Sequence, residues 1–114
     1  MPRTHQAYIA DILDAIDRIE KMTSGMDFAK FSNDRTVQDA VVKNLLVIGE
    51  AVKSIPGRKR AGFEEVEWRK IAGLRDVLIH AYSNIDKRIL WDVIKHKLDG
   101  LGKAAAVMMS EADH

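Results

Sequence analysis

The chain has 114 residues, of which 46% are hydrophobic and 31% are charged, with 18 basic and 17 acidic side chains. A chain of this length suits one globular domain and is too short for two ordinary ones, and its composition is not that of a disordered protein. The formal net charge of +1 excludes a general basic field, so the binding of a nucleic acid would need a local basic patch.

Several other classes of protein are excluded by what the sequence lacks. The absence of cysteine excludes a disulfide framework and a thiolate metal site. No apolar run approaches the roughly 20 residues of a membrane-spanning helix, and the first residues have no signal-peptide pattern. We therefore expect a cytoplasmic protein that is not bound to a membrane.

The spacing of the apolar residues predicts an all-α domain. Thr4 can cap a first helix over about 4–22, whose apolar stripe follows the helical period. The segment 26–31 is expected to form a short helical turn, which would lay Phe28 and Phe31 on the core.

A second helix is expected over about 35–55, after the capping cluster 32–34 and before Pro56, which should stop it. Its centre, 41–48, is apolar on nearly all sides, which is typical of a helix buried between several partners or between two subunits. Gly49 costs about 1 kcal/mol of helix stability relative to alanine. We therefore expect a close crossing with another helix at this glycine.

Three consecutive basic residues, Arg58, Lys59 and Arg60, follow in a predicted loop that runs to Phe63. A run of this kind is more often a solvated loop than a binding site. In a protein that cleaves RNA, however, it would be the obvious place to hold phosphates.

The third predicted helix begins near Glu65, with acidic residues in its first turn, and contains the most informative stretch of the chain. Arg75 falls near the middle of its apolar face, where a permanent cation is costly unless it is paired or faces a shared cleft. Glu50 borders the apolar stripe of the preceding helix and is either a partner for Arg75 or a solvated edge carboxylate; the second is the more common case. The apolar face holds Trp68, Ile71, Ala72, Leu78, Ile79 and Tyr82.

Possible catalytic groups cluster in the second half of this helix. Asp76 and His80 are one helical turn apart, so the carboxylate can orient the imidazole or stabilise its charge. Arg75 and His80 are roughly 140° apart on a regular helix, and Tyr82 lies roughly opposite His80. The three side chains can converge only if the helix ends or bends near His80, as the turn pair Ser83-Asn84 would allow.

A fourth helix is expected over about 87–109, capped by Asp86, with Gly100 and Gly102 marking a bend or a fraying end. The predicted architecture is therefore an up-down bundle of four main helices with short connections.

We expect one domain over 1–110 and a disordered tail over 111–114. No spacing of histidines and carboxylates suggests a metal site. Asp92 and His96 form a second pair one turn apart, without a neighbouring arginine and tyrosine, and are interpreted as a surface pair.

The pattern Arg-x4-His-x-Tyr, formed by Arg75, His80 and Tyr82, resembles the signature of the HepT-like proteins of the HEPN superfamily. The resemblance covers nearly the whole chain, from the first helix to the last. Many members follow the tyrosine with Phe-Gly, where this chain has Ser83-Asn84; this alters the turn but not the candidate catalytic groups. The supporting residues are Ile48-Gly49-Glu50-Ala51, Trp68, Gly73-Leu74, Ile85-Asp86 and Trp91.

The resemblance implies a HEPN-like bundle and a metal-independent endoribonuclease toxin without a cofactor, in which the motif helices of a homodimer line one cleft. His80 would exchange protons with the ribose 2′-hydroxyl or the leaving 5′-oxygen, Arg75 would stabilise charge on the phosphate, and Asp76 would hold the imidazole. The products would carry 2′,3′-cyclic phosphate ends. In an arbitrary helical protein, a histidine bonded to Asp76 would more often be structural.

The family also implies a partner, an MNT-type nucleotidyltransferase antitoxin that transfers AMP to the motif tyrosine, here Tyr82. The structural alternative for Tyr82 is an aromatic side chain packed at a helix end. A different class of function stays open, a catalytically silent helical module that binds and assists the nucleotidyltransferase, and the near-neutral charge fits it slightly better. A purely structural dimer would leave the position of Arg75 unexplained.

Overall fold

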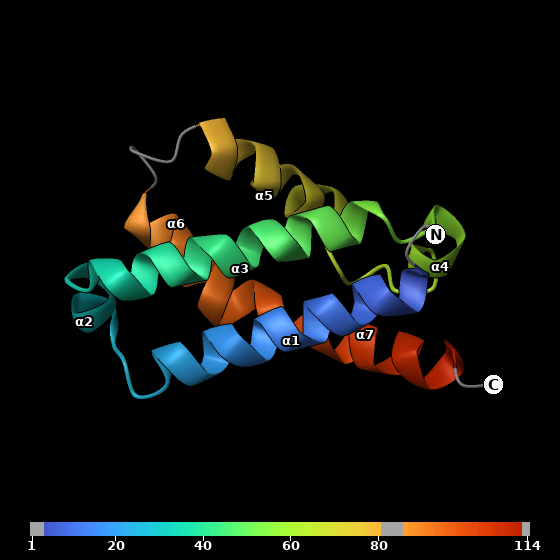
Figure 1. Cartoon of the computed structure of the whole chain (residues 1–114), viewed down its shortest axis with the longest axis horizontal. Helices are drawn as coiled ribbons and strands as arrows, with labels where there is room; N and C mark the ends of the chain where they lie inside the picture. Colours follow the sequence, from blue (N-terminus) through green and yellow to red (C-terminus); the bar gives the residue numbers. More distant parts are fainter. Residues whose placement is uncertain (1–3, 81–85, 113–114) are drawn as a thin grey trace.

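The computed structural model describes residues 4–80 and 86–112, with the backbone alone for Ile79, His80 and Ala112. Within these ranges all regular structure is helical, and the long helices lie alongside one another in a bundle of 44 × 29 × 28 Å (Figure 1). The elements are α1 (His5–Thr23), α2 (Phe28–Ser32), α3 (Arg35–Lys53), α4 (Gly57–Arg60), α5 (Trp68–His80), α6 (Lys87–Asp92), the π-helical segment η2 (Val93–Lys97) and α7 (Leu98–Ala112). The predicted all-α helical bundle is confirmed.

Four helices begin at caps that the sequence encodes. A side-chain oxygen of Thr4, Asp27, Asp34 and Asp86 accepts a hydrogen bond from a backbone N–H in the first turn of the following helix. Gly25, in the turn after α1, has a φ of 77°, a left-handed conformation that glycine adopts without a steric cost. Local chemistry therefore sets the helix starts that the sequence predicted at Thr4 and Asp86.

The core lies where three long helices meet. Helix α1 packs against α3 and α7, and α3 also packs against α5, so α3 is enclosed on several sides as its apolar centre predicted (Figure 1). Among the described residues, no helix is both long enough and apolar enough to cross a membrane. The largest side chains of the core include Ile12, Ile19, Phe31, Leu45, Ile48 and Leu101, each at most 1% exposed.

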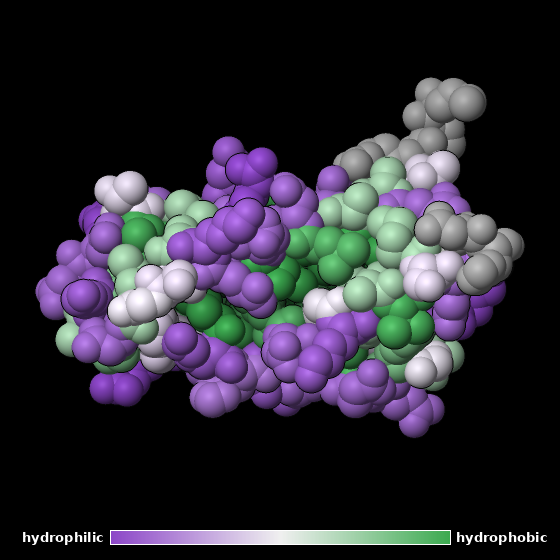
Figure 2. Space-filling model, turned by 90° about the horizontal axis from the view of Figure 1, so that it is seen from below, coloured by the Kyte–Doolittle hydropathy of each residue, from purple (hydrophilic) through white to green (hydrophobic). Residues whose placement is uncertain are grey.

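The face built by α1 and α7 is hollowed. A groove of about 320 Å³ runs between the two helices. From below, Figure 2 shows apolar residues gathered in a hollow, with hydrophilic residues around it. The groove is lined by Leu13, Ile16, Asp17, Glu20, Leu98, Asp99, Gly102, Lys103 and Ala106.

Two predictions around the third helix are wrong. The basic residues after Pro56 form the short helix α4 instead of a loop, because Pro56 supplies the extended backbone that precedes a helical turn. Helix α5 begins at Trp68 and not near Glu65, and its first turn holds no acidic residue. The Trp68 indole N–H donates to the carbonyl oxygen of Phe63 at 3.0 Å, which ties the start of the helix to the preceding turn.

The last predicted helix begins at Lys87 as expected but ends later than expected. It continues to Ala112, so residues 111 and 112 are helical and do not belong to a disordered tail, and its irregularity is the π-helical segment over 93–97, while Gly100 and Gly102 lie in the α-helical part. A Cβ on Gly102 would lie 3.6 Å from Cδ1 of Ile16, an ordinary van der Waals contact, so α7 passes close to α1 here but does not require a glycine.

Glu67 joins the start of α5 to the π-helical segment. Its carboxylate accepts hydrogen bonds from Nζ of Lys97 at 2.6 Å and from Nζ of Lys70 at 2.7 Å. The hydrogen bonds from Lys70 and Lys97 lower the pKa of Glu67 from 4.5 to about 2, and the bond to Glu67 raises the pKa of Lys97. The ionised carboxylate is therefore the form that the fold favours.

Glu67→Gln should lower the melting temperature at pH 7. The pKa of Glu67 is lower in the folded chain than in the unfolded chain, where it is 4.5. The ionised carboxylate therefore stabilises the fold fully at a pH above 4.5, and this stabilisation is lost as the pH falls from 4.5 towards about 2. The difference between the variant and the wild type, measured by thermal unfolding, should shrink over that range. Added salt should also reduce it, because the groups are solvent-exposed.

Glu64→Gln is the matched control, since Glu64 is a neighbouring exposed glutamate. Equal losses in the two variants, or a loss in Glu67→Gln that is the same at every pH, would contradict this interpretation.

Candidate active site

The motif helix α5 crosses α3 at Gly49. A Cβ built on Gly49 would lie 2.9 Å from the Cβ of Arg75 and 3.5 Å from the carbonyl oxygen of Ile71. Real Cβ atoms essentially never approach so closely, and only glycine permits the crossing as it stands. The predicted close crossing is confirmed, and it brings the backbone of Arg75 directly against α3.

Arg75 is paired across this crossing. Its Nε donates to Oε2 of Glu50 at 2.8 Å, and the two side chains are 35% and 59% exposed. Of the two interpretations of Glu50, the less common one, a partner for Arg75, matches this contact. The ion pair explains how a permanent cation is tolerated beside an apolar helix face.

Asp76 extends the charge cluster along α5. Its Oδ1 lies 3.4 Å from Nη1 of Arg75 and 3.6 Å from Nζ of Lys53 at the end of α3. The local balance is therefore two carboxylates and two cations, and Arg75 is not part of an electropositive surface within one chain.

Arg75 and Glu50 open onto a groove of about 360 Å³ between α1, α3 and α5. Two of its residues, Tyr8 and Asp11 on α1, were not singled out from the sequence. They lie one turn apart, and only the packing of α1 against α3 brings them near the motif helix. The groove is lined by Tyr8, Asp11, Leu46, Val47, Glu50, Ala51 and Arg75.

The other motif residues are described only in part. His80 is the last residue of α5, known here by its backbone, and Tyr82 lies outside the described residues. The predicted convergence of Arg75, His80 and Tyr82 stays a prediction. So does the orientation of the imidazole by Asp76.

The basic residues Arg58, Lys59 and Arg60 lie in α4, at the end of the bundle where α3 finishes and α5 starts, whereas His80 is at the other end of α5 (Figure 1). Arg58 and Lys59 are exposed, while Arg60 is half-buried. Within one chain, α4 is therefore separated from His80 by the length of α5, roughly 20 Å.

The chain matches one known family over most of its length. The family model described as ribonuclease HepT-like matches residues 12–108. The chain belongs to the HepT-like ribonuclease family. The helical bundle agrees with the HEPN superfamily to which the motif pointed.

Relatives of this HepT-like chain are found in archaea and bacteria. It is 42% identical, over 89% of its length and 92% of the relative, to a probable ribonuclease HepT of Thermococcus cleftensis. It is 37% identical to a putative RNase of Methanocaldococcus jannaschii, over 89% of this chain and 87% of that protein. A putative RNase of Caldanaerobacter subterraneus is 36% identical over 89% of the chain and 90% of its own length. No solved structure was found to match.

The pair formed by Asp92 and His96 lies on the surface of the HepT-like chain. His96 Nε2 lies 3.9 Å from Oδ1 of Asp92, and the two side chains are 71% and 57% exposed, so the surface-pair interpretation is confirmed. In the part of the chain that is described, no three histidine or carboxylate side chains are grouped to hold a metal ion.

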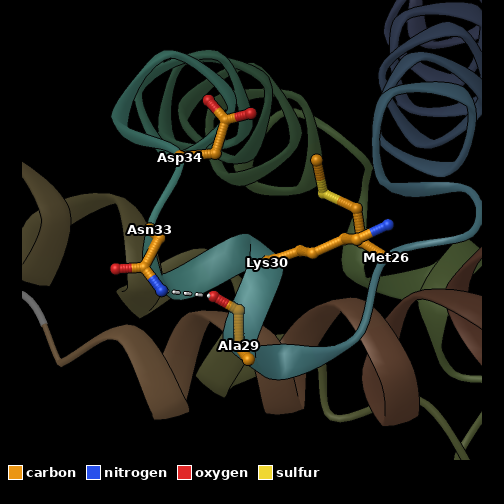
Figure 3. A pocket seen from close by; sticks show the side chains of 5 residues that line it. All are labelled: Met26, Ala29, Lys30, Asn33 and Asp34. Atoms are coloured by element: carbon orange, nitrogen blue, oxygen red, sulfur yellow. Dashed lines mark hydrogen bonds between the residues drawn. The ribbon is translucent and has the colours of Figure 1, made fainter.

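A third hollow lies beside α2, lined by Met26, Ala29, Lys30, Asn33 and Asp34 (Figure 3). The side-chain amide of Asn33 and the carboxylate of Asp34 both form hydrogen bonds with backbone groups. The Asn33 Nδ2 donates to the carbonyl oxygen of Ala29 at 2.9 Å, and Oδ1 of Asp34 accepts from the Val37 N–H at 3.1 Å. This hollow offers a substrate little more than one ammonium group.

Gly49→Ala should destabilise the fold by about 1–3 kcal/mol, because overpacking at the crossing outweighs the gain of helix propensity. Gly73→Ala is the matched control: Gly73 is in α5, and a Cβ built on it meets nothing within 4 Å. This control should stabilise the chain by up to about 1 kcal/mol. Urea unfolding of both variants measures the difference, and equal effects would refute the role of the crossing.

Proposed function

We propose that this chain is a metal-independent endoribonuclease that cleaves RNA with Arg75 and His80, as the toxin of a toxin–antitoxin pair. The observation that carries the proposal is Arg75, a paired but accessible arginine in a groove, on the helix that ends at His80. Membership of the HepT-like ribonuclease family supports the same reaction class.

Arg75 has the donors that a phosphate needs. A guanidinium carries five N–H groups, and the contacts with Glu50 and Asp76 use two of them. The remaining three can bind the two non-bridging oxygens of a phosphodiester and stabilise the charge that builds on them in the transition state. Glu50 fixes the direction of the guanidinium through Nε.

His80 is proposed as the group that moves protons. The ribose 2′-oxygen loses its proton and attacks phosphorus, while the bond to the 5′-oxygen breaks and that oxygen takes up a proton. The products are a 2′,3′-cyclic phosphate and a free 5′-hydroxyl, with no metal or cofactor required. Asp76, one turn before His80, is proposed to hold the imidazole.

A homodimer is proposed to complete the cleft. Val47 lines the groove next to Glu50 and is 38% exposed, an apolar surface that a second copy would cover. Two copies would bring two Arg75 and two His80 to one cleft. Arg58, Lys59 and Arg60 would then bind RNA away from the bond that is cleaved.

An MNT-type nucleotidyltransferase is proposed as the antitoxin, with Tyr82 as the residue that receives AMP. The tyrosine oxygen would attack the α-phosphorus of ATP, and pyrophosphate would leave. The added phosphate would lie near Arg75, compete with RNA for its donors and crowd the groove.

The second candidate is a catalytically silent module that binds the nucleotidyltransferase. One observation favours it: Arg75 is flanked by Glu50 and Asp76, so the surroundings of the motif in one chain are not electropositive. A ribonuclease assay separates the two functions.

Arg75→Ala and His80→Ala should each lower RNA cleavage by about 10²–10⁴-fold, the range for a lost proton-transfer or charge-stabilising group. Cleavage should be insensitive to a chelator, and mass analysis of the fragments should find cyclic phosphate ends. His96→Ala is the matched control. Undiminished cleavage by both motif variants would reject the ribonuclease proposal.

Intact-mass analysis after co-expression with the proposed nucleotidyltransferase partner should show an increase in whole AMP units, because Tyr82 is the residue proposed to receive AMP. The increase should be lost in Tyr82→Phe and kept in Tyr8→Phe. Tight binding of the partner with no added mass would instead indicate inhibition by complex formation.

A further inference from the structure

Two aromatic rings and two cations form a continuous row where α2 meets α6. The Cζ of Arg88 lies 4.1 Å from the ring centre of Phe28, and the Nζ of Lys95 lies 4.7 Å from that of Trp91. The two rings meet edge to face with their centroids 6.4 Å apart. The order in space is therefore Arg88, Phe28, Trp91, Lys95.

The rings are anchored, while the cations are exposed. Trp91 packs on the buried ring of Phe31 at 5.2 Å, and Nζ of Lys87 donates to the carbonyl oxygen of Ser32 at 3.0 Å, which holds α6 on α2. A cation that is already held over a ring loses less conformational freedom when it binds a ligand. Its N–H groups remain available to an anion.

The row lies at the end of the bundle where the motif helix α5 finishes. Helix α6 begins seven residues after His80, so the chain itself limits the separation of Lys87 from His80 to roughly 25 Å. In Figure 1, the start of α6 is at the same end of the bundle as the end of α5, while α4 is at the opposite end. The row is thus the better placed of the two basic surfaces to hold RNA near His80.

The neighbouring carboxylates do not remove this positive charge. Asp27 and Asp86 each accept a backbone N–H at a helix start, where the helix dipole compensates a negative charge. Asp92 lies 3.9 Å from His96 and is directed to that side chain.

We propose that Arg88 and Lys95, held over Phe28 and Trp91, form a phosphate-binding track for single-stranded RNA that leads to the His80 end of α5. The inference rests on the proposed ribonuclease function and adds the surface that holds the substrate. Phosphodiester oxygens accept hydrogen bonds from the guanidinium and the ammonium. The two rings hold the cations in fixed positions, one at each end of the row, so a flexible single strand can place successive phosphates against them.

Binding of a fluorescent single-stranded RNA to the inactive His80→Ala protein tests the track. Adding Arg88→Ala and Lys95→Ala should weaken binding several-fold and lower the slope of log affinity against log salt by about 1.4, the value for two lost phosphate contacts on a single strand. Arg18→Ala with Lys21→Ala, two exposed cations on α1, is the matched control and should change neither quantity.

Cleavage of a dinucleotide by the otherwise wild-type double variant separates this inference from the proposed reaction. A dinucleotide has a single phosphodiester, which the reacting site itself would hold, so its cleavage should be unchanged while cleavage of long RNA becomes less efficient. Unchanged RNA affinity and salt slope in the double variant would overturn the track, even if the enzyme remains active. A double variant that changes only by melting at a lower temperature would show that the row has a purely structural role. If the double variant still binds RNA but loses a protein partner, the surface binds that protein and not RNA. If the His80→Ala protein without further changes fails to bind RNA, both proposals are overturned.

Discussion

The close approach of α3 and α5 at Gly49 is the constraint on which the candidate site depends. Because a side chain at this position would collide with Arg75, the two helices pack with almost no space between their backbones. The next residue on α3, Glu50, is then within reach of the Arg75 guanidinium. One glycine therefore determines both the crossing and the direction of the arginine, since the geometry of the ion pair follows from the distance between the helices.

The candidate site carries little net positive charge. With one excess positive charge in the whole chain, the molecule cannot attract RNA by a general field. Arg75 is instead oriented by two carboxylates, which keep it in one place and leave donors for a phosphate. The proposed division assigns orientation of the reacting phosphate to α5 and retention of the strand to α6, so that neither helix needs a large basic surface.

Sequence patterns predicted the helices well where the signal is local. Caps such as Thr4 and Asp86 and the apolar stripes depend on neighbours within one or two turns, and the structure has them as expected. The short helix α4 and the late start of α5 at Trp68 were not predicted. The start of α5 depends on the hydrogen bond from the Trp68 indole to the carbonyl oxygen of Phe63, which forms only in the folded chain.

For the site, the motif predicted which residues belong together but not all their contacts. Gly49 was correctly expected to mark a crossing, because a glycine inside a helix needs a compensating contact. Tyr8 and Asp11 in the same groove lie more than sixty residues before Arg75 in the sequence, so no pattern in the sequence connected them to the motif. The aromatic row had one visible signal, Trp91, whose partners on α2 appear only in the folded chain.

The π-helical segment 93–97 gives the last helix an unusual tolerance to change in length. A π-helical turn commonly holds one residue more than an α-helical turn, and it separates the part of the helix that contacts α2 from the part that contacts α1. Removal of one residue there would restore a regular helix and leave the two parts facing as they do now, because the wider turn accommodates the extra residue locally. Natural relatives that differ by a single insertion or deletion in this region would therefore keep the same faces at the two ends of the helix.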